Sequence, residues 1–270
     1  MEYEQIIITG ASSGFGELFA RELARAAVGP CEIVLIARRR ERLELLAAEL
    51  REACPGVVPS VLPCDLALPD ARAALLEKLC ALPPKRCLLI NNAGLGDYGE
   101  FVSSEPQKNG RIMQVNMSAL VELSRGLLPQ LLSAGGDIIN ISSLAADVFL
   151  PDFALYAASK SFVTSFTEGL RLELLKSGVR VLAVCPGPVH TGFGDVAQRA
   201  GRDRGDMPLK QWFYTPASVV VRGALRALAK GRARYYPSMK IWLSSCLLRA
   251  LPVWALRWVL SSRPRKTKLT

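Results

Sequence analysis

The chain has few of the residues that build metal centres and covalent frameworks. It contains a single histidine, His190, among 270 residues, so a metal cluster held by histidines is not expected. Its seven cysteines are odd in number and form no CxxC pair, which indicates reduced, mostly buried thiols in a cytoplasmic protein. The N-terminus lacks the basic start and the long apolar run of a signal peptide, which argues against secretion.

Acidic residues are absent from the last quarter of the chain. The final one is Asp206, and residues 207–270 hold 13 lysines and arginines with no Asp or Glu. Residues 1–206 hold the other 21 cations against all 24 acids, so this larger part is nearly neutral. This uneven charge informs about binding partners and not about the fold. We expect an anionic partner to bind the C-terminal part of the chain. Nucleic acid is not expected as a partner, because the chain has no recognition motif for it.

Short apolar runs alternate with longer segments of helical period. The apolar runs predict strands at residues 6–9, 32–37, 57–62, 87–90, 137–141 and 180–185. The segments between them predict helices at residues 15–27, 40–53, 66–82, 108–132 and 154–176. This alternation is typical of an α/β fold with a doubly wound, Rossmann-like parallel sheet. We expect a single domain, with a dinucleotide-binding and catalytic core over 1–192 and a substrate lid and basic helical extension over 193–270.

A glycine-rich turn lies between the first predicted strand and the first predicted helix. Its spacing is GxxxGxG; the glycines would let the backbone approach a pyrophosphate, and the helix start offers free N–H groups. A flexible Gly/Ser loop is the alternative, which the position between strand and helix disfavours. The candidate cofactor-binding residues of this turn are Gly10, Ser12, Ser13, Gly14, Phe15 and Gly16.

The end of the second predicted strand discriminates between the two nicotinamide dinucleotides. NAD enzymes usually have Asp or Glu there to hold the ribose 2′-hydroxyl, whereas this chain has Arg38, Arg39 and Arg40. A guanidinium suits a 2′-phosphate by charge and geometry, so we expect NADP(H) rather than NAD. The alternative is that these arginines only solvate the next helix. After the third strand, Asp65 and Leu66 are further candidates: Asp65 would accept a hydrogen bond from adenine or cap the following helix.

A tyrosine and a lysine lie one turn apart in the predicted helix 154–176. Tyr156 and Lys160 therefore share a helix face. A phenol has an ordinary pKa of ~10, and a neighbouring ammonium lowers that pKa, so the pair suits proton exchange with a carbonyl or alcohol oxygen. The spacing alone is common on exposed helices. The pair becomes informative because the chain also contains the glycine turn and two serines upstream of the pair, Ser142 and Ser143.

Together these motifs occur in the order found in short-chain dehydrogenases/reductases. Over about residues 5–192 the chain resembles this family, and its arginines resemble those of NADP-preferring members. The motifs that carry the resemblance are the glycine turn, Asn91-Asn92-Ala93-Gly94, Asn116, Ser142-Ser143, Tyr156 with Lys160, and Pro186-Gly187 followed by Thr191. Each motif alone is weak, but their joint order is specific.

The resemblance implies a role for each matching catalytic residue. Tyr156 would be the general acid–base, and Lys160 would lower its pKa and hydrogen-bond the nicotinamide ribose. Ser143, thirteen residues before Tyr156, would hold the substrate oxygen. Ser142 is the alternative that the family spacing disfavours. Asn116 would support a water linking Lys160 to solvent.

Further cofactor contacts are implied in the same way. The residues after the fourth strand would line the ribose, and the loop after the sixth strand would pack near the nicotinamide, with a threonine on its carboxamide. These candidates are Asn92, Ala93, Gly94, Pro186, Gly187, Val189 and Thr191. Simpler interpretations of three of these residues stay open. Asn91 and Asn92 could form a turn after the strand, and Asn116 could be a polar residue inside a helix that is hydrogen-bonded to backbone. A Ser-His-Asp hydrolase would need His190 as base, but the chain has no Gly-x-Ser-x-Gly elbow.

Beyond Thr191 the family motifs end. Residues 193–212 predict a glycine-containing substrate lid, and residues 219–230 a basic helix. Residues 241–260 are apolar, rich in tryptophan and interrupted by Pro252. Two interpretations stay open for this last segment: a helix that packs over the substrate pocket or a subunit interface, and a segment that lies in an anionic membrane interface through residues 241–268.

From the motifs and the resemblance we expect an NADP(H)-dependent oxidoreductase that acts on a carbonyl or secondary alcohol, with reduction favoured. The substrate would be lipophilic: a 3-oxoacyl thioester, a steroid- or retinoid-like ketone, or a lipid aldehyde. The alternative is a non-catalytic NADP-binding regulator, which the complete Asn-Ser-Tyr-Lys set disfavours. We expect a cytoplasmic homodimer or homotetramer, either free or peripheral to a membrane. An anionic carrier such as coenzyme A or an acyl carrier protein is another partner that the basic segment would suit.

Overall fold

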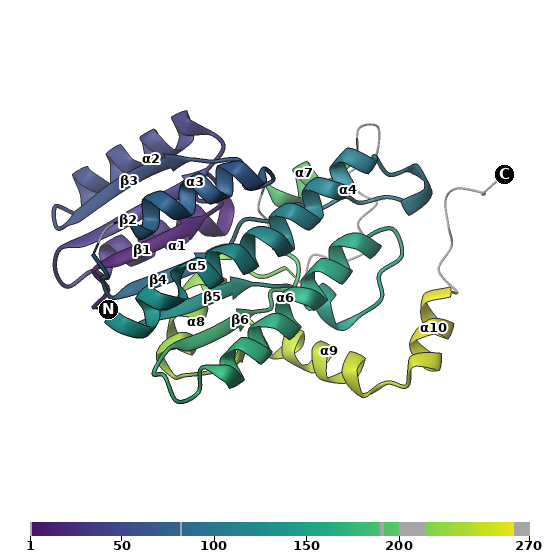
Figure 1. Ribbon diagram of the computed structural model, residues 1–270. Helices are drawn as coiled ribbons and strands as arrows, with labels where there is room; N and C mark the ends of the chain where they lie inside the picture. Colours follow the sequence, from purple (N-terminus) through teal and green to yellow (C-terminus); the bar gives the residue numbers. More distant parts are fainter. Residues whose placement is uncertain (1, 82, 190–191, 200–213, 262–270) are drawn as a thin grey trace.

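The computed structural model describes residues 2–81, 83–189, 192–199 and 214–261, and its centre is a parallel sheet. The seven strands follow the order β3-β2-β1-β4-β5-β6-β7, all parallel. The order reverses between β1 and β4, the point where doubly wound sheets bind ligands at their carboxyl ends. The strands are β1 (Gln5–Thr9), β2 (Cys31–Ala37), β3 (Val57–Pro63), β4 (Cys87–Asn91), β5 (Gly136–Ile141), β6 (Arg180–Val184) and β7 (Arg234–Tyr235) (Figure 1).

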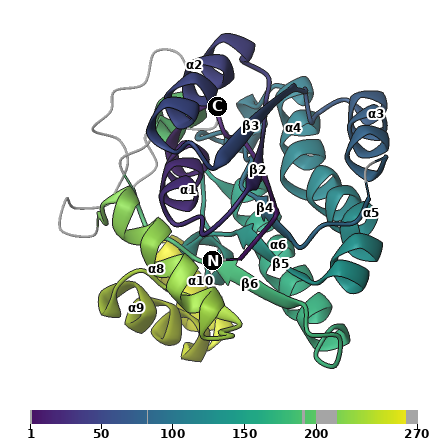
Figure 2. The same ribbon diagram turned by 90° about the vertical axis from the view of Figure 1, so that its left-hand side faces the viewer.

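Helices cover both faces of this sheet. Figure 2 shows α1, α2 and α8 on one side and α3, α4, α5 and α6 on the other. The α-helices of the described residues are α1 (Gly14–Arg25), α2 (Arg40–Ala53), α3 (Pro69–Cys80), α4 (Pro106–Met113), α5 (Ala119–Ala134), α6 (Ala154–Glu173), α7 (Phe193–Ala197), α8 (Ala217–Ala229), α9 (Met239–Ala250) and α10 (Val253–Ser261).

The two layers arise from the alternation of side chains along the strands. In β1, Ile6 and Ile8 pack with Phe19 of α1 in one apolar cluster, and Ile7 packs with Leu127 of α5 in the other. All five residues of β1 and of β4 are buried, as expected for central strands of a parallel sheet covered on both faces. The prediction of a doubly wound, Rossmann-like parallel sheet in a single domain is confirmed.

Two helix predictions need correction. The helix expected at 66–82 begins only at Pro69, because Leu68 N–H bonds back to Asp65 O in a turn and proline is suited to the first helical position. The helix expected at 108–132 is divided into α4 and α5 by a π-helical turn, η2 (Gln114–Ser118). Both deviations lie beside the site described below.

Part of the expected C-terminal extension is built into the sheet domain. The two-residue strand β7 pairs with β6, and Val220 and Val221 of α8 join the cluster that contains Phe19. Arg222 of α8 also pairs with Glu22 of α1. The strand was not predicted, because two residues carry no periodicity.

Candidate active site

Tyr156 and Lys160 lie on the inner face of α6, at the carboxyl end of β5. Tyr156 is 8% exposed and Lys160 4%. The ammonium of Lys160 donates a hydrogen bond to Ile141 O, the last residue of β5, at 2.8 Å, and lies 5.7 Å from the centre of the Tyr156 ring. The end of a sheet strand thus fixes the lysine, while the helix turn places the tyrosine beside it.

The two serines after β5 have different surroundings. Ser143 precedes the short 3-10 helix η3 (Leu144–Asp147); its hydroxyl accepts the N–H of Ala145 at 3.1 Å and lies close enough to the Tyr156 phenol to lower the pKa of that phenol. Ser142 is buried away from that phenol, where its hydroxyl donates to Lys160 O at 3.0 Å. Adjacent residues of an extended segment point to opposite sides, which explains the separation. Ser143 shares the site with Tyr156, and Ser142 anchors α6.

The pKa values of the pair differ from the sequence expectation in one respect. Burial raises the pKa of Tyr156 to about 12, although the Ser143 hydrogen bond opposes this shift. Burial also lowers the pKa of Lys160 to about 8. The expected lowering of the tyrosine pKa by the lysine is therefore not found in this structure, because desolvation of the phenol is the largest effect. At neutral pH the phenol keeps its proton and is able to donate it.

Asn116 lies in the π-helical turn η2 and joins three parts of the site. Its side-chain oxygen accepts the N–H of Leu95 at 2.8 Å, and its amide nitrogen donates to Leu95 O and to Ser159 Oγ, both at 2.9 Å. The extra residue of a π-turn re-aims side chains and often marks functional sites. The interpretation of Asn116 as a residue bonded to backbone thus holds in part, but the backbone belongs to the loop after β4, not to its own helix.

Space beside Lys160 is kept open by a glycine. A Cβ at Gly94 would lie 3.4 Å from Lys160 Nζ and 3.7 Å from Asn116 Oδ1. The predicted water of Asn116 would have to use the remaining lone pair of Oδ1 or a neighbouring carbonyl, and this role stays a prediction.

The glycine turn after β1 has a backbone that requires glycine. Gly10 and Gly14 have φ of +66° and +59°. A Cβ at Gly10 would lie 2.8 Å from Asn92 Nδ2, and one at Gly16 would lie 2.4 Å from Gly10 O. No side chain caps the start of α1 after Ser13, so its first N–H groups face the turn. A close, positively polarised backbone of this kind fits the pyrophosphate of a dinucleotide.

Asn92 braces this turn from the loop after β4. Its amide nitrogen donates to Thr9 O at 2.8 Å and to Gly10 O at 3.2 Å. The Thr9 hydroxyl in turn accepts the N–H groups of Asn92 and Ala93, at 2.9 and 3.0 Å. Asn92 was expected to line the cofactor ribose; the structure gives its nitrogen end a supporting role, and Ala93 and Gly94 continue the loop toward Lys160.

The arginines after β2 reach the glycine turn. Arg39 donates from Nε and Nη2 to Ser12 Oγ at 3.2 and 2.9 Å, and from Nη2 to Ser12 O at 3.1 Å. Arg38 and Arg40 are exposed next to it. Three cations therefore follow β2, at the strand end near which the 2′ position of an adenosine ribose would lie in a doubly wound sheet.

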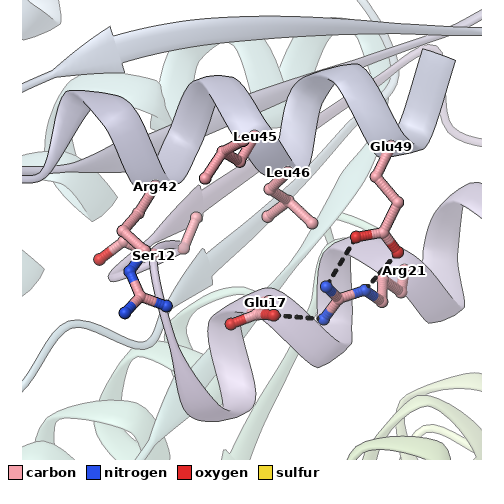
Figure 3. Close-up of a pocket in the computed structure, with 8 residues that line it drawn as sticks. Ser12, Glu17, Arg21, Arg42, Leu45, Leu46 and Glu49 are labelled. Carbon is pink, nitrogen blue, oxygen red and sulfur yellow. Dashed lines mark hydrogen bonds and ion pairs between the residues drawn. The ribbon is translucent and has the colours of Figure 1, made fainter.

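A pocket of about 180 Å³ lies between α1 and α2, next to these arginines. Figure 3 shows Arg42 at its Ser12 end and Arg21 at the other end, where Glu17 and Glu49 bind the Arg21 guanidinium. Of the two arginines that line this pocket, Arg21 is held in ion pairs and Arg42 forms none within the part of the chain that the structure describes. Sequence reasoning missed Arg42. Its position three residues after Arg39, in the first turn of α2, was the available signal.

Asp65 is engaged with protein groups. Its carboxylate accepts from Arg111 at 2.8 and 3.1 Å and from the N–H of Ala67 at 3.0 Å. Burial opposes ionisation, but the Arg111 and Ala67 hydrogen bonds together hold the pKa of Asp65 below its ordinary value. Because α3 begins at Pro69, Asp65 does not cap that helix. Its neighbour Leu66 is buried in the sheet layer and offers its carbonyl to Arg72.

Aromatic rings form a wall around Tyr156. Phe153 stacks on the Tyr156 ring with centroids 4.2 Å apart, and Phe193 of α7 lies 5.3 Å from it on a tilted plane. Tyr98 adds an edge contact to Phe153 at 5.8 Å. Sequence reasoning missed Phe153, although an aromatic residue three positions before the tyrosine on the same helix face was a usable signal. The reacting end of the site is therefore apolar.

The loop after β6 closes the site from another side. Pro186 O accepts the N–H of Leu144, which follows Ser143, at 2.8 Å. A Cβ at Gly187 would lie 2.4 Å from Ile241 Cδ1, so a side chain there would displace Ile241 where α9 crosses the loop. Val189 packs against the apolar cluster of α1 and α8. The remaining predicted contact of this loop, Thr191, lies outside the described residues, as does His190.

The first part of the predicted lid is tied down by ion pairs. Arg199 binds Asp97 with both of its donor edges, Nη2 to Oδ2 at 2.6 Å and Nε to Oδ1 at 3.0 Å. Lys108 of α4 binds the same carboxylate at 2.9 Å, and Arg199 also donates to Ser103 Oγ at 2.7 Å. The Arg199 hydrogen bonds are the largest cause that lowers the pKa of Asp97. Residues 200–212 of the predicted lid lie outside the described residues.

Comparison with known proteins places this geometry in a family. The sequence profile described as "short chain dehydrogenase" matches residues 4–200. The chain is a short-chain dehydrogenase/reductase. It is 34% identical over 189 residues to a dehydrogenase/reductase SDR family protein 7-like of Drosophila melanogaster, a match that covers 69% of this chain and only 57% of that relative.

Solved structures of this family agree with the fold and differ in cofactor. A short-chain dehydrogenase from Sphingobium yanoikuyae in complex with NADPH superposes with a TM-score of 0.80 at 30% identity, covering 98% of this chain and 97% of that one. A family member from Burkholderia phymatum in complex with NAD superposes with a TM-score of 0.76 at 25% identity, covering 91% and 92%. This short-chain dehydrogenase/reductase is thus an oxidoreductase that uses a nicotinamide cofactor, and the relatives alone do not decide which one.

Proposed function

We propose that this short-chain dehydrogenase/reductase reduces the carbonyl group of a lipophilic substrate with NADPH. The observation that carries the proposal is the buried Tyr156 phenol beside Lys160: burial raises its pKa to about 12 and keeps it protonated, Ser143 lies next to it, and the Lys160 ammonium is 5.7 Å from its ring centre. A protonated, water-shielded donor beside a dinucleotide cradle suits reduction of a carbonyl.

Each residue of the site would have its own role in the reaction. The backbone of Gly10, Gly14 and Gly16 would hold the pyrophosphate, and the bound cofactor supplies a hydride to the carbonyl carbon. Ser143 Oγ would donate a hydrogen bond to the carbonyl oxygen and fix it near the phenol. Tyr156 then gives its proton to that oxygen as the alcohol forms.

Lys160 would act on the tyrosine after the proton leaves. Its pKa of about 8 leaves it largely protonated at pH 7, so its ammonium can stabilise the phenolate across the 5.7 Å that separate it from the ring centre. The low local dielectric that raises the tyrosine pKa also strengthens this attraction.

Preference for NADPH is supported by the charge at the end of β2. Arg38 and Arg39 directly follow β2, Arg42 lines the adjacent pocket, and no Asp or Glu stands between β2 and Glu41. A 2′-phosphate would gain charge-assisted hydrogen bonds there, while a bare 2′-hydroxyl would lack the acceptor that NAD enzymes provide.

A lipophilic substrate is supported by the aromatic wall. Phe153 and Phe193 flank the Tyr156 ring, and Leu150 packs against the small apolar cluster that contains it. A 3-oxoacyl chain, a steroid-like ketone or a lipid aldehyde would bury apolar area there.

Turnover of both cofactors over a graded carbonyl panel tests the proposal. The purified chain is given NADPH or NADH with aldehydes and ketones of increasing apolar size, and consumption of reduced cofactor is followed. We expect NADPH to give a kcat/KM at least ~10-fold above NADH, since one charge-assisted hydrogen bond is worth that much, and we expect kcat/KM to rise with apolar size. A preference for NADH would overturn the cofactor assignment. Tight NADPH binding without turnover of any substrate would instead favour the non-catalytic regulator.

A further inference from the structure

The two C-terminal helices expose many of their large apolar side chains. The residues that face solvent include Met239, Trp242, Leu243 and Leu247 of α9 and Val253, Trp254 and Trp258 of α10, which together we call the C-terminal ridge. Figure 1 shows both helices, in yellow, leaving the sheet domain, with α10 farthest from it. An ordinary surface helix buries such side chains and exposes polar ones.

The inner face of α9 is in part polar and bonded to the body. Ser245 is 1% exposed; its hydroxyl donates to Asp147 Oδ2 at 2.7 Å and lies 2.9 Å from Tyr236 Oη. Ile241 is fully buried against Gly187. Because these contacts fix the rotation of α9, the outward direction of Trp242 and Leu247 is set by the fold.

The tryptophans make this surface costly to leave in water. Trp254 is 73% exposed, Trp258 71% and Trp242 46%. These are three of the four tryptophans of the chain. A tryptophan offers up to ~250 Å² of surface for burial, and indole rings are favoured where one end is apolar and the other wet. A partner that provides such a boundary is therefore indicated.

The charge of the ridge selects an anionic partner. Its helices contain Lys240, Arg249 and Arg257 and no Asp or Glu. A second copy docked on the same surface by two-fold symmetry would bring cations against cations. A surface of lipid phosphates would instead complement them, at about 1 kcal/mol for each cation near the surface.

Length excludes a spanning arrangement. With 12 and 9 residues, α9 and α10 are about 18 and 14 Å long, whereas a bilayer core is about 30 Å thick. Among the described residues no helix is long and apolar enough to cross a membrane. Short helices with tryptophans on one face and cations nearby lie in the interfacial plane.

We propose that the C-terminal ridge binds the surface of an anionic lipid bilayer. Trp242, Trp254 and Trp258 insert at the headgroup boundary, and Arg249 and Arg257 contact lipid phosphates. This inference goes beyond the proposed reaction and does not depend on it. The ridge is joined to the active site through Asp147, which lies in η3 directly after Ser143 and accepts the hydroxyl of Ser245. A docked ridge therefore holds the substrate side of the enzyme near the membrane.

Vesicle co-sedimentation of the full chain tests this proposal. The vesicles contain phosphatidylcholine alone or with 30% phosphatidylglycerol, and each is measured at low and high salt. We expect binding to the anionic vesicles at low salt and a marked loss at high salt. Trp242→Ser/Trp254→Ser/Trp258→Ser should weaken binding by roughly 100-fold or more, and Arg249→Gln/Arg257→Gln by roughly 30-fold, as two cations at the surface predict.

A matched control variant and two measurements of folding accompany the binding experiment. Val28→Ser/Val58→Ser removes exposed apolar side chains near β3, the opposite edge of the sheet, and should bind like wild type. Circular dichroism and the melting temperature verify that each variant is folded. No binding to anionic vesicles at low salt overturns the proposal, and so does equal binding by the tryptophan variant. A ridge that instead joins two copies, seen as a smaller oligomer of the tryptophan variant without vesicle binding by wild type, also overturns it.

Discussion

The floor of the active site and its cover are held by different kinds of contact. On the floor, Lys160 and Asn116 are hydrogen-bonded to the backbone of Ile141 and Leu95, at the carboxyl edge of the sheet. In the cover, Arg199 binds the side chain of Asp97, Ala197 O of α7 accepts the N–H of Tyr98, and Phe193 meets Tyr156 through a ring contact. The backbone of a packed sheet moves little, whereas the few contacts of the cover lie outside the sheet and can separate without disturbing the core.

The two parts of the site meet different requirements: proton transfer needs fixed positions, and substrate entry needs an opening. Proton transfer needs positions fixed to within a fraction of an ångström, and the sheet provides them. Entry of a substrate needs a boundary that can open, and a boundary held by an ion pair, one backbone hydrogen bond and an aromatic contact can do so. Substitutions on the floor should therefore change kcat, and substitutions in the cover should change KM.

The largest effect is expected on the floor, at Lys160. Lys160→Met removes the cation that stabilises the phenolate and should lower kcat by roughly 10³-fold. The KM for substrate should change far less, because Lys160 is buried behind Tyr156 and bonded to Ile141. Steady-state kinetics at saturating NADPH measure both constants. A kcat close to wild type would mean that the ammonium takes no part in the reaction.

The same variant has a pH signature in its stability. The pKa of Lys160 falls from its ordinary 10.5 to about 8 on burial, so between these values the unfolded chain binds more protons. Wild-type stability therefore gains with rising pH through this window, while below pH 8 the cost of the buried cation is fully present. The free energy of unfolding of Lys160→Met, taken relative to that of wild type, should therefore fall by roughly 3 kcal/mol between pH 7.5 and pH 10.5. Denaturant unfolding at several pH values measures the difference, and a pH-independent difference would contradict this account of the burial.

A smaller effect is expected in the cover. Arg199→Met breaks the paired hydrogen bonds to Asp97 and should raise the substrate KM by roughly 10-fold, with kcat within about 3-fold of wild type. Lys108→Met is the matched control, because Lys108 binds the same carboxylate from α4 and leaves α7 attached. That control should stay within about 2-fold of wild type in KM. Equal effects of the two substitutions on KM would show that the Asp97 ion pairs stabilise the local structure and do not control the opening of the cover.

Much of this fold was predictable because its signals are local. The bounds of α2 were predicted residue for residue, since a strand end, a cationic start and a regular apolar period coincide there. The site motifs were also local: a glycine turn, a serine pair and a tyrosine–lysine pair. The π-turn at Asn116 was not, because it depends on bonds to Leu95 and Ser159, which lie 21 and 43 residues away.

Other features missed from the sequence have the same origin in tertiary contacts. The raised pKa of Tyr156 reflects burial by Phe153 and Phe193, which a helix-face argument does not contain. The two-residue strand β7 exists only because β6 offers an edge. The outward face of α9 is decided by Ser245 and its partner Asp147, far away in sequence. Such features need the assembled fold.

Tyr156→Phe tests the central claim most directly. The substitution keeps the ring and its contacts with Phe153 and Phe193 and removes only the hydroxyl. On the best carbonyl substrate of the panel, with NADPH saturating, we expect kcat to fall by roughly 10³-fold while the NADPH dissociation constant and the melting temperature stay near wild type. A variant that turns over within about 3-fold of wild type would contradict the assignment of the Tyr156 phenol as the proton donor.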